Sequence, residues 1–188
     1  GLVDGFVPSN LNQVYKCAKD EWILKAPMPT PRGYLAAAEV NGKIYVLGGT
    51  NDNASGLSTN EMYNPRTNTW ETRYPMPTPR YGLTAVAVDG KIYAIGGSIR
   101  HGYPLLNTVE MYDPQTDTWV SRSPMPTPRE HLAAAELDGK IYVMGGYDYN
   151  NGITANEVYD PLTDTWEQKI PLPTGRYALS AAVHKGKV

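Results

Sequence analysis

Short apolar runs alternate with clusters of polar turn residues along most of this chain. The run at 35–40 (LAAAEV) is followed by Asn-Gly and then by a second apolar run, KIYVLGG. Asn-Gly and Asp-Gly pairs are strong hairpin signals, because both residues adopt positive φ at low cost. The β-branched and aromatic residues of the second run favour a strand. The pattern predicts a hairpin, and a helix over the alanine-rich run is the alternative.

Each predicted hairpin is followed by a polar loop and by two further strand signals. The third strand reads EMYN or EVYD, and the fourth begins at a Trp after a turn such as DPQTDT. Pro and Asp suit turn positions, because Pro has a fixed φ and Asp can bond the nearby backbone. The sequence unit is therefore four consecutive antiparallel strands.

This four-stranded unit recurs at a nearly constant period. The hexapeptide PMPTPR stands at 27–32, 75–80 and 124–129, and a variant, PLPTGR, stands at 171–176. A Trp precedes the Arg of each hexapeptide by ten residues in all four copies. Four-stranded antiparallel units with a period of about 40–50 residues predict the blades of a β-propeller. The predicted fold class is therefore all-β.

The repeat predicts one propeller domain, or a propeller segment, over residues 1–188. It contains three complete blades, preceded by the C-terminal half of a blade and followed by the N-terminal half of another. The boundaries are 1–26, 27–74, 75–123, 124–170 and 171–188. The innermost strands of a propeller converge on its axis, where only small side chains fit, and this accounts for the alanine-rich first strand.

The repeated residues resemble the kelch-repeat family. The resemblance rests on the Gly pair, a Tyr about a dozen residues later, and a Trp nine residues after the Glu of the third strand. It covers nearly the whole chain, and no adaptor domain accompanies the blades. The resemblance implies a propeller of usually six or seven blades, with the innermost strand first in each blade.

The two half blades leave the number of blades open. In repeat register Val188 aligns with Ile44 and Gly1 aligns with Gly49, so both ends fall in the same blade. The chain is either a segment of a larger ring, which we prefer, or a closed four-bladed ring. Alternatively, two chains complete each other's split blades by self-association. An unclosed ring leaves strand edges exposed.

The differences between the repeats point to one face of the propeller. Strand alternation places the loop between second and third strands, and the hexapeptide, at the same end of each blade. All length variation falls in that loop, at Thr50–Asn60, Ser98–Val109 and Tyr147–Asn156. Variable loops on a rigid scaffold are the usual binding surface. The turns at the opposite end are nearly uniform, and we interpret them as structural.

Candidate binding residues lie in these loops and directly after each Arg, where the chain enters the central channel. Tyr offers a stacking face and a hydroxyl group at low entropy cost. The alternative for any one of these Tyr residues is packing between blades. The candidates at the channel mouth are Tyr34, Tyr81, Glu130, His131 and Tyr177, and those in the loops are His101, Tyr103, Tyr147, Asp148 and Tyr149.

The recurrent Arg of the hexapeptide allows two interpretations. In kelch domains that bind acidic peptides, Arg residues at the channel entrance carry recognition, so the resemblance makes these residues candidates. The alternative is a buried Arg–Glu pair that links blades, since a Glu recurs in the third strand of each full repeat. Gln13 replaces this Glu in the first half repeat. The four candidates are Arg32, Arg80, Arg129 and Arg176.

Enzymatic alternatives find little support in the residues. A copper site like that of galactose oxidase needs a Tyr–Cys cross-link, and Cys17 stands alone in a predicted outer region. A sugar mutarotase needs acid and base groups at the channel mouth. Glu130 and His131 could serve, but adjacent residues of a strand point to opposite faces. We predict no catalytic residue, no metal ligand and no cofactor.

Composition and charge limit the classes of molecule that the protein is expected to bind. The net charge is −2 and no Lys/Arg run exists, which disfavours nucleic acid and anionic membrane. We therefore predict a non-catalytic module that binds a protein or peptide, with carbohydrate as the alternative and a sialic-acid mutarotase as a distant third. The small number of Lys residues and the many Asn, Thr and Tyr residues weakly favour an extracellular location, but the sequence does not assign a compartment.

Overall fold

The computed structural model describes residues 2–3, 7–51, 55–102 and 104–188, and every regular element in these ranges is a β-strand. Three four-stranded antiparallel sheets follow one another in the chain, as the repeat predicts. The first sheet contains β5 (Ala36–Val40), β6 (Lys43–Leu47), β7 (Asn60–Asn64) and β8 (Thr69–Thr72). The second contains β9 (Thr84–Val88), β10 (Lys91–Ile95), β11 (Val109–Asp113) and β12 (Thr118–Arg122). The third contains β13 (Ala133–Leu137), β14 (Lys140–Met144), β15 (Asn156–Asp160) and β16 (Thr165–Gln168).

The remaining strands form two small hairpins near the N-terminus. β1 (Leu2–Val3) pairs with β2 (Val7–Pro8), and β3 (Gln13–Lys16) pairs with β4 (Glu21–Leu24). In repeat register β3 and β4 are the third and fourth strands of the first half blade. None of the described residues forms a helix long and apolar enough to cross a membrane.

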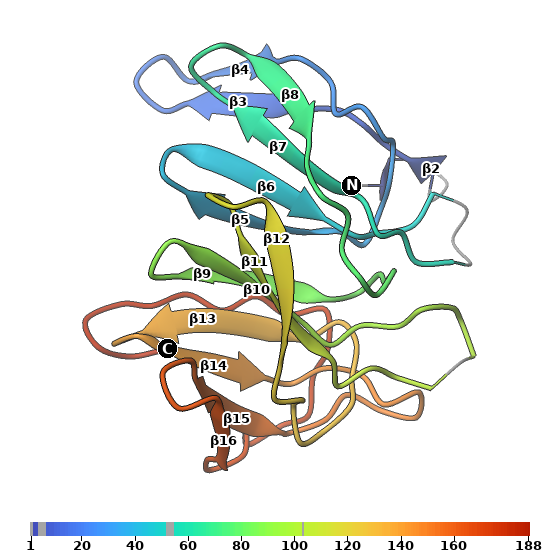
Figure 1. Ribbon diagram of the computed structural model, residues 1–188, viewed down its shortest axis with the longest axis vertical. Coiled ribbons are helices and arrows are strands. Elements are labelled where there is room, and N and C mark those ends of the chain that lie inside the picture. Colours follow the sequence, from blue (N-terminus) through green and yellow to red (C-terminus); the bar gives the residue numbers. More distant parts are fainter. Residues whose placement is uncertain (1, 4–6, 52–54, 103) are drawn as a thin grey trace.

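The alanine-rich runs are the innermost strands, as expected of kelch blades. β5 contacts β9, and β9 contacts β13, so the first strands of the three sheets lie side by side. Figure 1 shows the sheets following one another along the long axis, from β3–β4 at the top to β13–β16 at the bottom. Small side chains such as Ala36 and Ala38 are buried there. The helix alternative for these runs is wrong.

The hydrophobic core lies between neighbouring sheets. One cluster joins the β5–β8 and β9–β12 sheets, and a second joins β9–β12 to β13–β16. Met76 and Met125, the second residues of two hexapeptides, are almost completely buried in these clusters. The hexapeptide therefore anchors the crossing from one blade to the next through its Met, while its prolines stiffen the path.

A polar joint at the outer edge also links successive blades. The Trp70 indole N–H donates to the carbonyl of Ala26 at 2.8 Å, and the Asn68 side chain accepts from the Ala26 N–H at 2.9 Å. The Tyr63 hydroxyl donates to the same Asn68 oxygen at 2.9 Å. The joint recurs with Trp119, Asp117 and Tyr112, and again with Trp166, Asp164 and Tyr159.

Close packing between blades explains the glycine pair at the end of each second strand. The N–H of Gly97 donates to the carbonyl of Arg129, at the start of the next blade, at 2.9 Å. Gly96 has φ +66°, and a Cβ there would lie 2.7 Å from the same carbonyl oxygen. The pair thus lets two blades approach at main-chain distance, which a side chain would prevent.

The two half blades lie at different ends of the series of sheets. The first half blade, with the β3–β4 hairpin, packs beside the β5–β8 sheet, where the Trp70 indole N–H of β8 donates to the carbonyl of Ala26. Residues 176–179 pack against the β13–β16 sheet, where the N–H of Gly146 donates to the carbonyl of Arg176. Among the described residues no ladder pairs the two half blades. Completion of a blade by a second chain stays a prediction.

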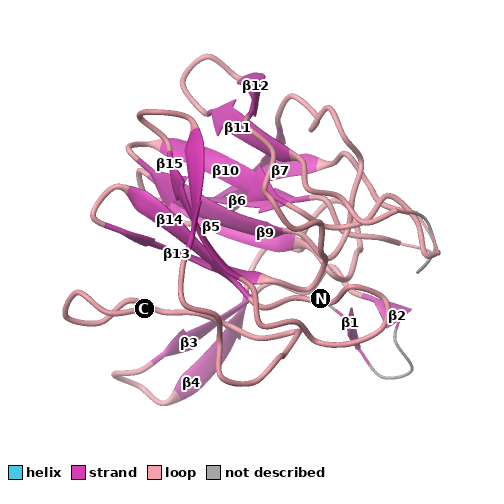
Figure 2. Cartoon of the chain, turned by 90° about the horizontal axis from the view of Figure 1, so that it is seen from below, coloured by secondary structure: helices cyan, strands magenta, loops and turns pink. Residues whose placement is uncertain are grey.

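The variable loops and hexapeptides gather at one end of the strands, and the tight hairpin turns lie toward the other. Figure 2 shows the long loops on the right of the sheets. In the hairpin turn before β10, Asp89 and Gly90 have φ of 48° and 73°, which the Asp-Gly signal predicts.

Candidate functional site

The channel mouth is built by one left-handed residue from each of four successive units. These residues stand two positions after each hexapeptide Arg, and their φ angles lie between 51° and 62°. They are Tyr34, Gly82, His131 and Ala178. Three of the four are not Gly, although a side chain makes positive φ unfavourable. Such strained backbone is often found at functional sites.

Main-chain hydrogen bonds join these four residues in a row. The N–H of Gly82 donates to the carbonyl of Tyr34 at 2.9 Å, and the N–H of His131 donates to the carbonyl of Gly82 at 2.7 Å. The N–H of Ala178 donates to the carbonyl of His131 at 2.9 Å. The backbone of the mouth is therefore set by the scaffold, while the side chains that it presents differ from blade to blade.

A cavity of about 320 Å³ opens at this mouth, and we call it the mouth cavity. Every residue that lines it is one of the candidates predicted from the sequence. The lining residues are Tyr34, Tyr81, His101, Glu130, His131, Tyr147 and Tyr177. They come from three units and the final half blade, so no single repeat contains the site.

A second cavity of about 230 Å³ adjoins the mouth cavity along the channel. Tyr34 and His131 line both cavities, and the rest of the second is lined by leucines and small residues. The polar and aromatic groups are therefore concentrated at the entrance, and apolar side chains continue along the channel.

The structure corrects the expectation that Glu130 and His131 point to opposite faces. Both side chains line the mouth cavity, and His131 Nε2 lies 4.0 Å from Glu130 Oε1. The alternation of side chains holds only in extended backbone, and His131 has φ of 52°. The left-handed turn therefore brings two adjacent titratable groups to one side.

Aromatic contacts shape the walls of the mouth cavity. The Tyr34 and His131 rings meet edge to face with centroids 5.4 Å apart, and Tyr34 also lies 6.2 Å from Tyr81. On the other side the Tyr147 and Tyr177 rings lie 4.9 Å apart. Tyr177 is 54% exposed and Tyr34 is 38% exposed, so these two rings remain accessible to a ligand.

Glu130 is the most unusual group of the site. The residue is only 4% exposed, and its Oε2 atom has no hydrogen-bond partner among the described residues. Burial raises the pKa of Glu130, and the nearby His101 acts in the opposite direction. Burial also lowers the pKa of His131, which favours the neutral imidazole. An unsatisfied buried carboxyl group is costly for the fold, which suggests a role in binding.

We expect Glu130→Gln to stabilise the protein at pH 7. Because folding raises the pKa of Glu130, the folded state binds its proton more tightly than the unfolded chain does. The resulting stability is complete below the ordinary Glu pKa of 4.5 and is lost as the pH rises through the raised value. The neutral amide should therefore raise the free energy of unfolding at pH 7 by ~1 kcal/mol.

Urea denaturation followed by Trp fluorescence between pH 4 and pH 8 measures this effect. Glu157→Gln is the matched control, since Glu157 is equally buried but faces Arg129, and its neutralisation should lower stability. A Glu130→Gln variant that is less stable than the wild type at pH 7 contradicts the prediction.

The other loop candidates lie behind the cavity wall or outside the described residues. Tyr149 does not line the cavity, but its carbonyl accepts from the Tyr147 hydroxyl at 3.0 Å and its hydroxyl lies 3.0 Å from Ser98 Oγ. Asp148 caps its own loop by accepting from the N–H groups of Asn150 and Asn151, which lowers its pKa. Tyr103 lies outside the described residues.

For three of the four candidate Arg residues, burial shows that the prediction of ligand binding is wrong. Their side chains are fully buried, and each donates to a Glu of its own repeat unit at 2.6–2.7 Å. The pairs are Arg32–Glu61, Arg80–Glu110 and Arg129–Glu157. No ligand at the mouth can reach these guanidinium groups, so the buried-pair alternative holds, although within a blade rather than between blades. Arg176 is exposed and does not line the mouth cavity.

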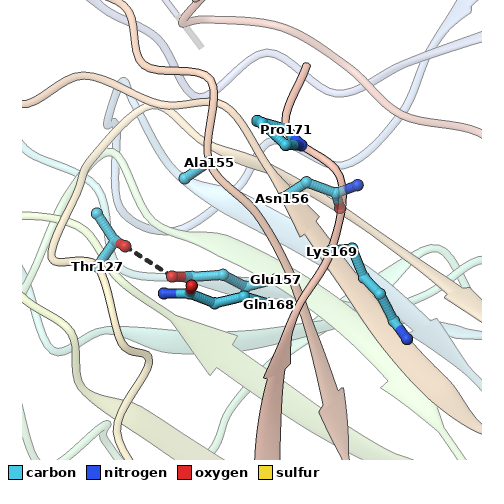
Figure 3. Close-up of a pocket in the computed structure, with 7 residues that line it drawn as sticks. All are labelled: Thr127, Ala155, Asn156, Glu157, Gln168, Lys169 and Pro171. Atoms are coloured by element: carbon cyan, nitrogen blue, oxygen red, sulfur yellow. Dashed lines mark hydrogen bonds between the residues drawn. The ribbon is translucent and has the colours of Figure 1, made fainter.

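A further cavity of about 200 Å³ lies at the outer end of the β13–β16 sheet (Figure 3). There the Thr127 hydroxyl donates to Glu157 at 2.6 Å. The same bond joins Thr30 to Glu61 and Thr78 to Glu110, also at 2.6 Å. Because this chemistry recurs in every full blade and supports the buried Arg, we interpret the cavity as part of the scaffold.

Sequence reasoning missed the left-handed backbone at the mouth. One signal could have revealed it, because Gly82 occupies this position in one copy, and Gly is the residue expected where φ is positive. The other copies place Tyr, His and Ala there, which hides the signal.

Comparison with known proteins agrees with this architecture. A similar solved structure is that of YjhT, with a TM-score of 0.80 and 18% sequence identity over 94% of this chain. The chain spans 62% of the YjhT chain, and at this identity the likeness concerns the fold alone. No protein with a curated description matches the chain. A family model described as the KLHDC2/KLHL20/DRC7 Kelch-repeats domain matches residues 8–188, and the chain therefore belongs to the Kelch-repeat family.

Proposed function

We propose that the chain is a non-catalytic binding module that holds a protein or peptide segment at the mouth cavity and the flanking loops. The observation that carries the proposal is the convergence on one open cavity of seven side chains from four successive units, at positions where the copies differ. The scaffold positions are nearly invariant between copies, whereas these seven are not. Variation that is confined to one face of a repeat scaffold is typical of recognition.

The chemistry of the cavity suits an extended peptide. Tyr side chains supply contact area and a hydrogen-bonding hydroxyl at low entropy cost, and four of the seven lining residues are Tyr. A cavity of about 320 Å³ accommodates one side chain of a partner, while the variable loops extend the contact beyond it.

Carbohydrate is the second candidate, because the exposed rings of Tyr34 and Tyr177 could stack on a pyranose. A sugar acid such as sialic acid is disfavoured by charge. Glu130 contributes a buried carboxyl group, and the guanidinium groups of Arg32, Arg80 and Arg129 are held in buried ion pairs away from the cavity. Mutarotation of free sialic acid is accordingly expected to show no rate above the uncatalysed one.

A peptide-display experiment tests the proposal. A random heptapeptide library is panned on the wild-type protein, and the clones are then compared on Tyr34→Ala/Tyr177→Ala and on Tyr74→Ala. Tyr74 is the matched control because it is 62% exposed and lies outside the cavity, and only its backbone is engaged in the blade joint. We expect peptides that bind the wild type and the control but lose at least tenfold in affinity on the double variant.

Two results contradict the proposal. Selected peptides that bind the double variant as well as the wild type place recognition elsewhere. Failure to select any peptide, together with glycan-array binding that is lost in the double variant, assigns the mouth cavity to carbohydrate.

A further inference from the structure

Glu130 differs from every other buried Glu that the structure describes. Glu61, Glu110 and Glu157 each accept from an Arg and from a Thr hydroxyl at 2.6–2.7 Å. Glu130 is buried to a similar degree, yet its Oε2 atom accepts no hydrogen bond from the described residues. The scaffold thus neutralises the three recurrent carboxylates, whereas at the channel mouth no described residue donates a hydrogen bond to Glu130 Oε2.

The groups around Glu130 do not supply a permanent positive charge. His131 Nε2 lies 4.0 Å from Glu130 Oε1, but burial keeps its pKa below the usual range, so the ring is neutral near pH 7. His101 is the other basic group in the lining, on an exposed loop residue. The remaining lining residues are Tyr34, Tyr81, Tyr147 and Tyr177. Within the part of the chain that the structure describes, no Lys or Arg lines the cavity.

Tyr rings and a carboxylate are complementary to the same kind of ligand. An aromatic face carries negative charge density and attracts a cation placed within about 6 Å of the ring centroid. A buried carboxylate gains most from a partner that is both charged and a hydrogen-bond donor. Tyr34 lies beside Tyr81, and Tyr147 lies beside Tyr177, so rings from neighbouring blades face the cavity together.

We propose that the mouth cavity binds a cationic side chain, Lys or Arg, of a partner peptide, with Glu130 as its counter-charge and the Tyr rings as its walls. The inference rests on the proposed peptide-binding function and adds the sign of the charge that is recognised. This sign is opposite to the one expected from exposed Arg residues, because Arg32, Arg80 and Arg129 are already paired in the interior. The ammonium or guanidinium group supplies the donors that Glu130 Oε2 lacks.

Isothermal titration calorimetry with defined peptides tests the proposal. The probes are the capped pentapeptides acetyl-Gly-Gly-Arg-Gly-Gly-amide, its Lys version, and its citrulline version, which keeps the shape of Arg without the charge. We expect the Arg and Lys peptides to bind the wild type at least tenfold more tightly than the citrulline peptide. Glu130→Gln should abolish this preference, and Glu130→Asp, which keeps the charge, should retain part of it.

Glu167→Gln is the control for a general loss of negative charge. Glu167 lies in the same unit, its side chain is 66% exposed, and it is remote from the lining, so its neutralisation should leave the preference unchanged. The Glu130→Gln variant is expected to be at least as stable as the wild type, and its denaturation curve shows directly that it is folded.

The outcomes separate this inference from the proposed function. Equal binding of the Arg and citrulline peptides, lost in Tyr34→Ala/Tyr177→Ala, keeps the peptide-binding function and overturns the cation site. A charge preference that survives in Glu130→Gln also overturns it. Absence of peptide binding at millimolar concentration, with methyl glucoside binding in its place, overturns both.

Discussion

Arg80→Ala is expected to lower the free energy of unfolding by about 4 kcal/mol, enough to unfold a marginally stable domain. The Arg80 guanidinium is completely buried and donates to Glu110 at 2.7 Å and to the carbonyl of Thr108 at 2.9 Å. Its removal leaves the Glu110 carboxylate in the interior, where the Thr78 hydroxyl is then its only side-chain donor among the described residues. The loss measures the cost of this uncompensated charge rather than the net value of the pair.

The repeat supplies a matched control for this prediction. Arg176 stands at the same position of its repeat, but it is exposed and has no Glu partner among the described residues. Arg176→Ala should change the stability by no more than about 0.5 kcal/mol in the same urea titration. In addition, Arg80→Leu combined with Glu110→Leu should be less damaging than Arg80→Ala alone, since no charge is left unpaired. Equal effects at Arg80 and Arg176 refute the assignment.

Gly96→Ala is expected to cost about 3 kcal/mol or more, because a Cβ at this position meets the backbone of the next blade. The added atom would lie 2.7 Å from the Arg129 carbonyl oxygen and 3.2 Å from the Leu132 side chain. The contact with a carbonyl oxygen cannot be relieved by a rotamer change. The two blades must therefore separate, or the alanine must leave its left-handed conformation.

Gly90→Ala separates the steric clash from the conformational strain. Gly90 has φ +73° in a hairpin turn and Gly96 has φ +66°, so both alanines meet a similar left-handed penalty of about 1–2 kcal/mol. No atom lies within 4 Å of a Cβ at Gly90. The excess destabilisation of Gly96→Ala over Gly90→Ala, read from urea midpoints, reports the inter-blade contact. Indistinguishable midpoints would show that the blades can move apart at no cost.

The sequence was sufficient for the blade architecture because every element is repeated. The Asp89-Gly90 hairpin, the strand that opens near Trp119 and the alanine-rich innermost strands each recur with a fixed spacing. Repetition turns weak local signals into a firm prediction, since an accidental pattern does not return three times in register. The candidate residues at the channel mouth could be predicted for the same reason, because they stand where the repeats differ from one another.

The orientation of individual side chains could not be predicted in this way. The alternation rule assigned Glu130 and His131 to opposite faces, but the left-handed φ at His131 brings both into the cavity. The location of Arg32, Arg80 and Arg129 depended on long-range packing against Glu residues about 30 positions away in the chain, which sequence spacing alone does not reveal.

The hydrogen-bonded row from Tyr34 to Ala178 has a consequence for how the side chains of the channel mouth can vary. Since these bonds involve only main-chain atoms, the backbone of the mouth does not depend on which side chains the blades present, although rings of different blades contact one another there. A substitution in one copy therefore changes one part of the cavity lining, while the backbone of the other three copies keeps its place. Single repeats can thus be exchanged to alter the lining of the mouth cavity while the strand scaffold is kept.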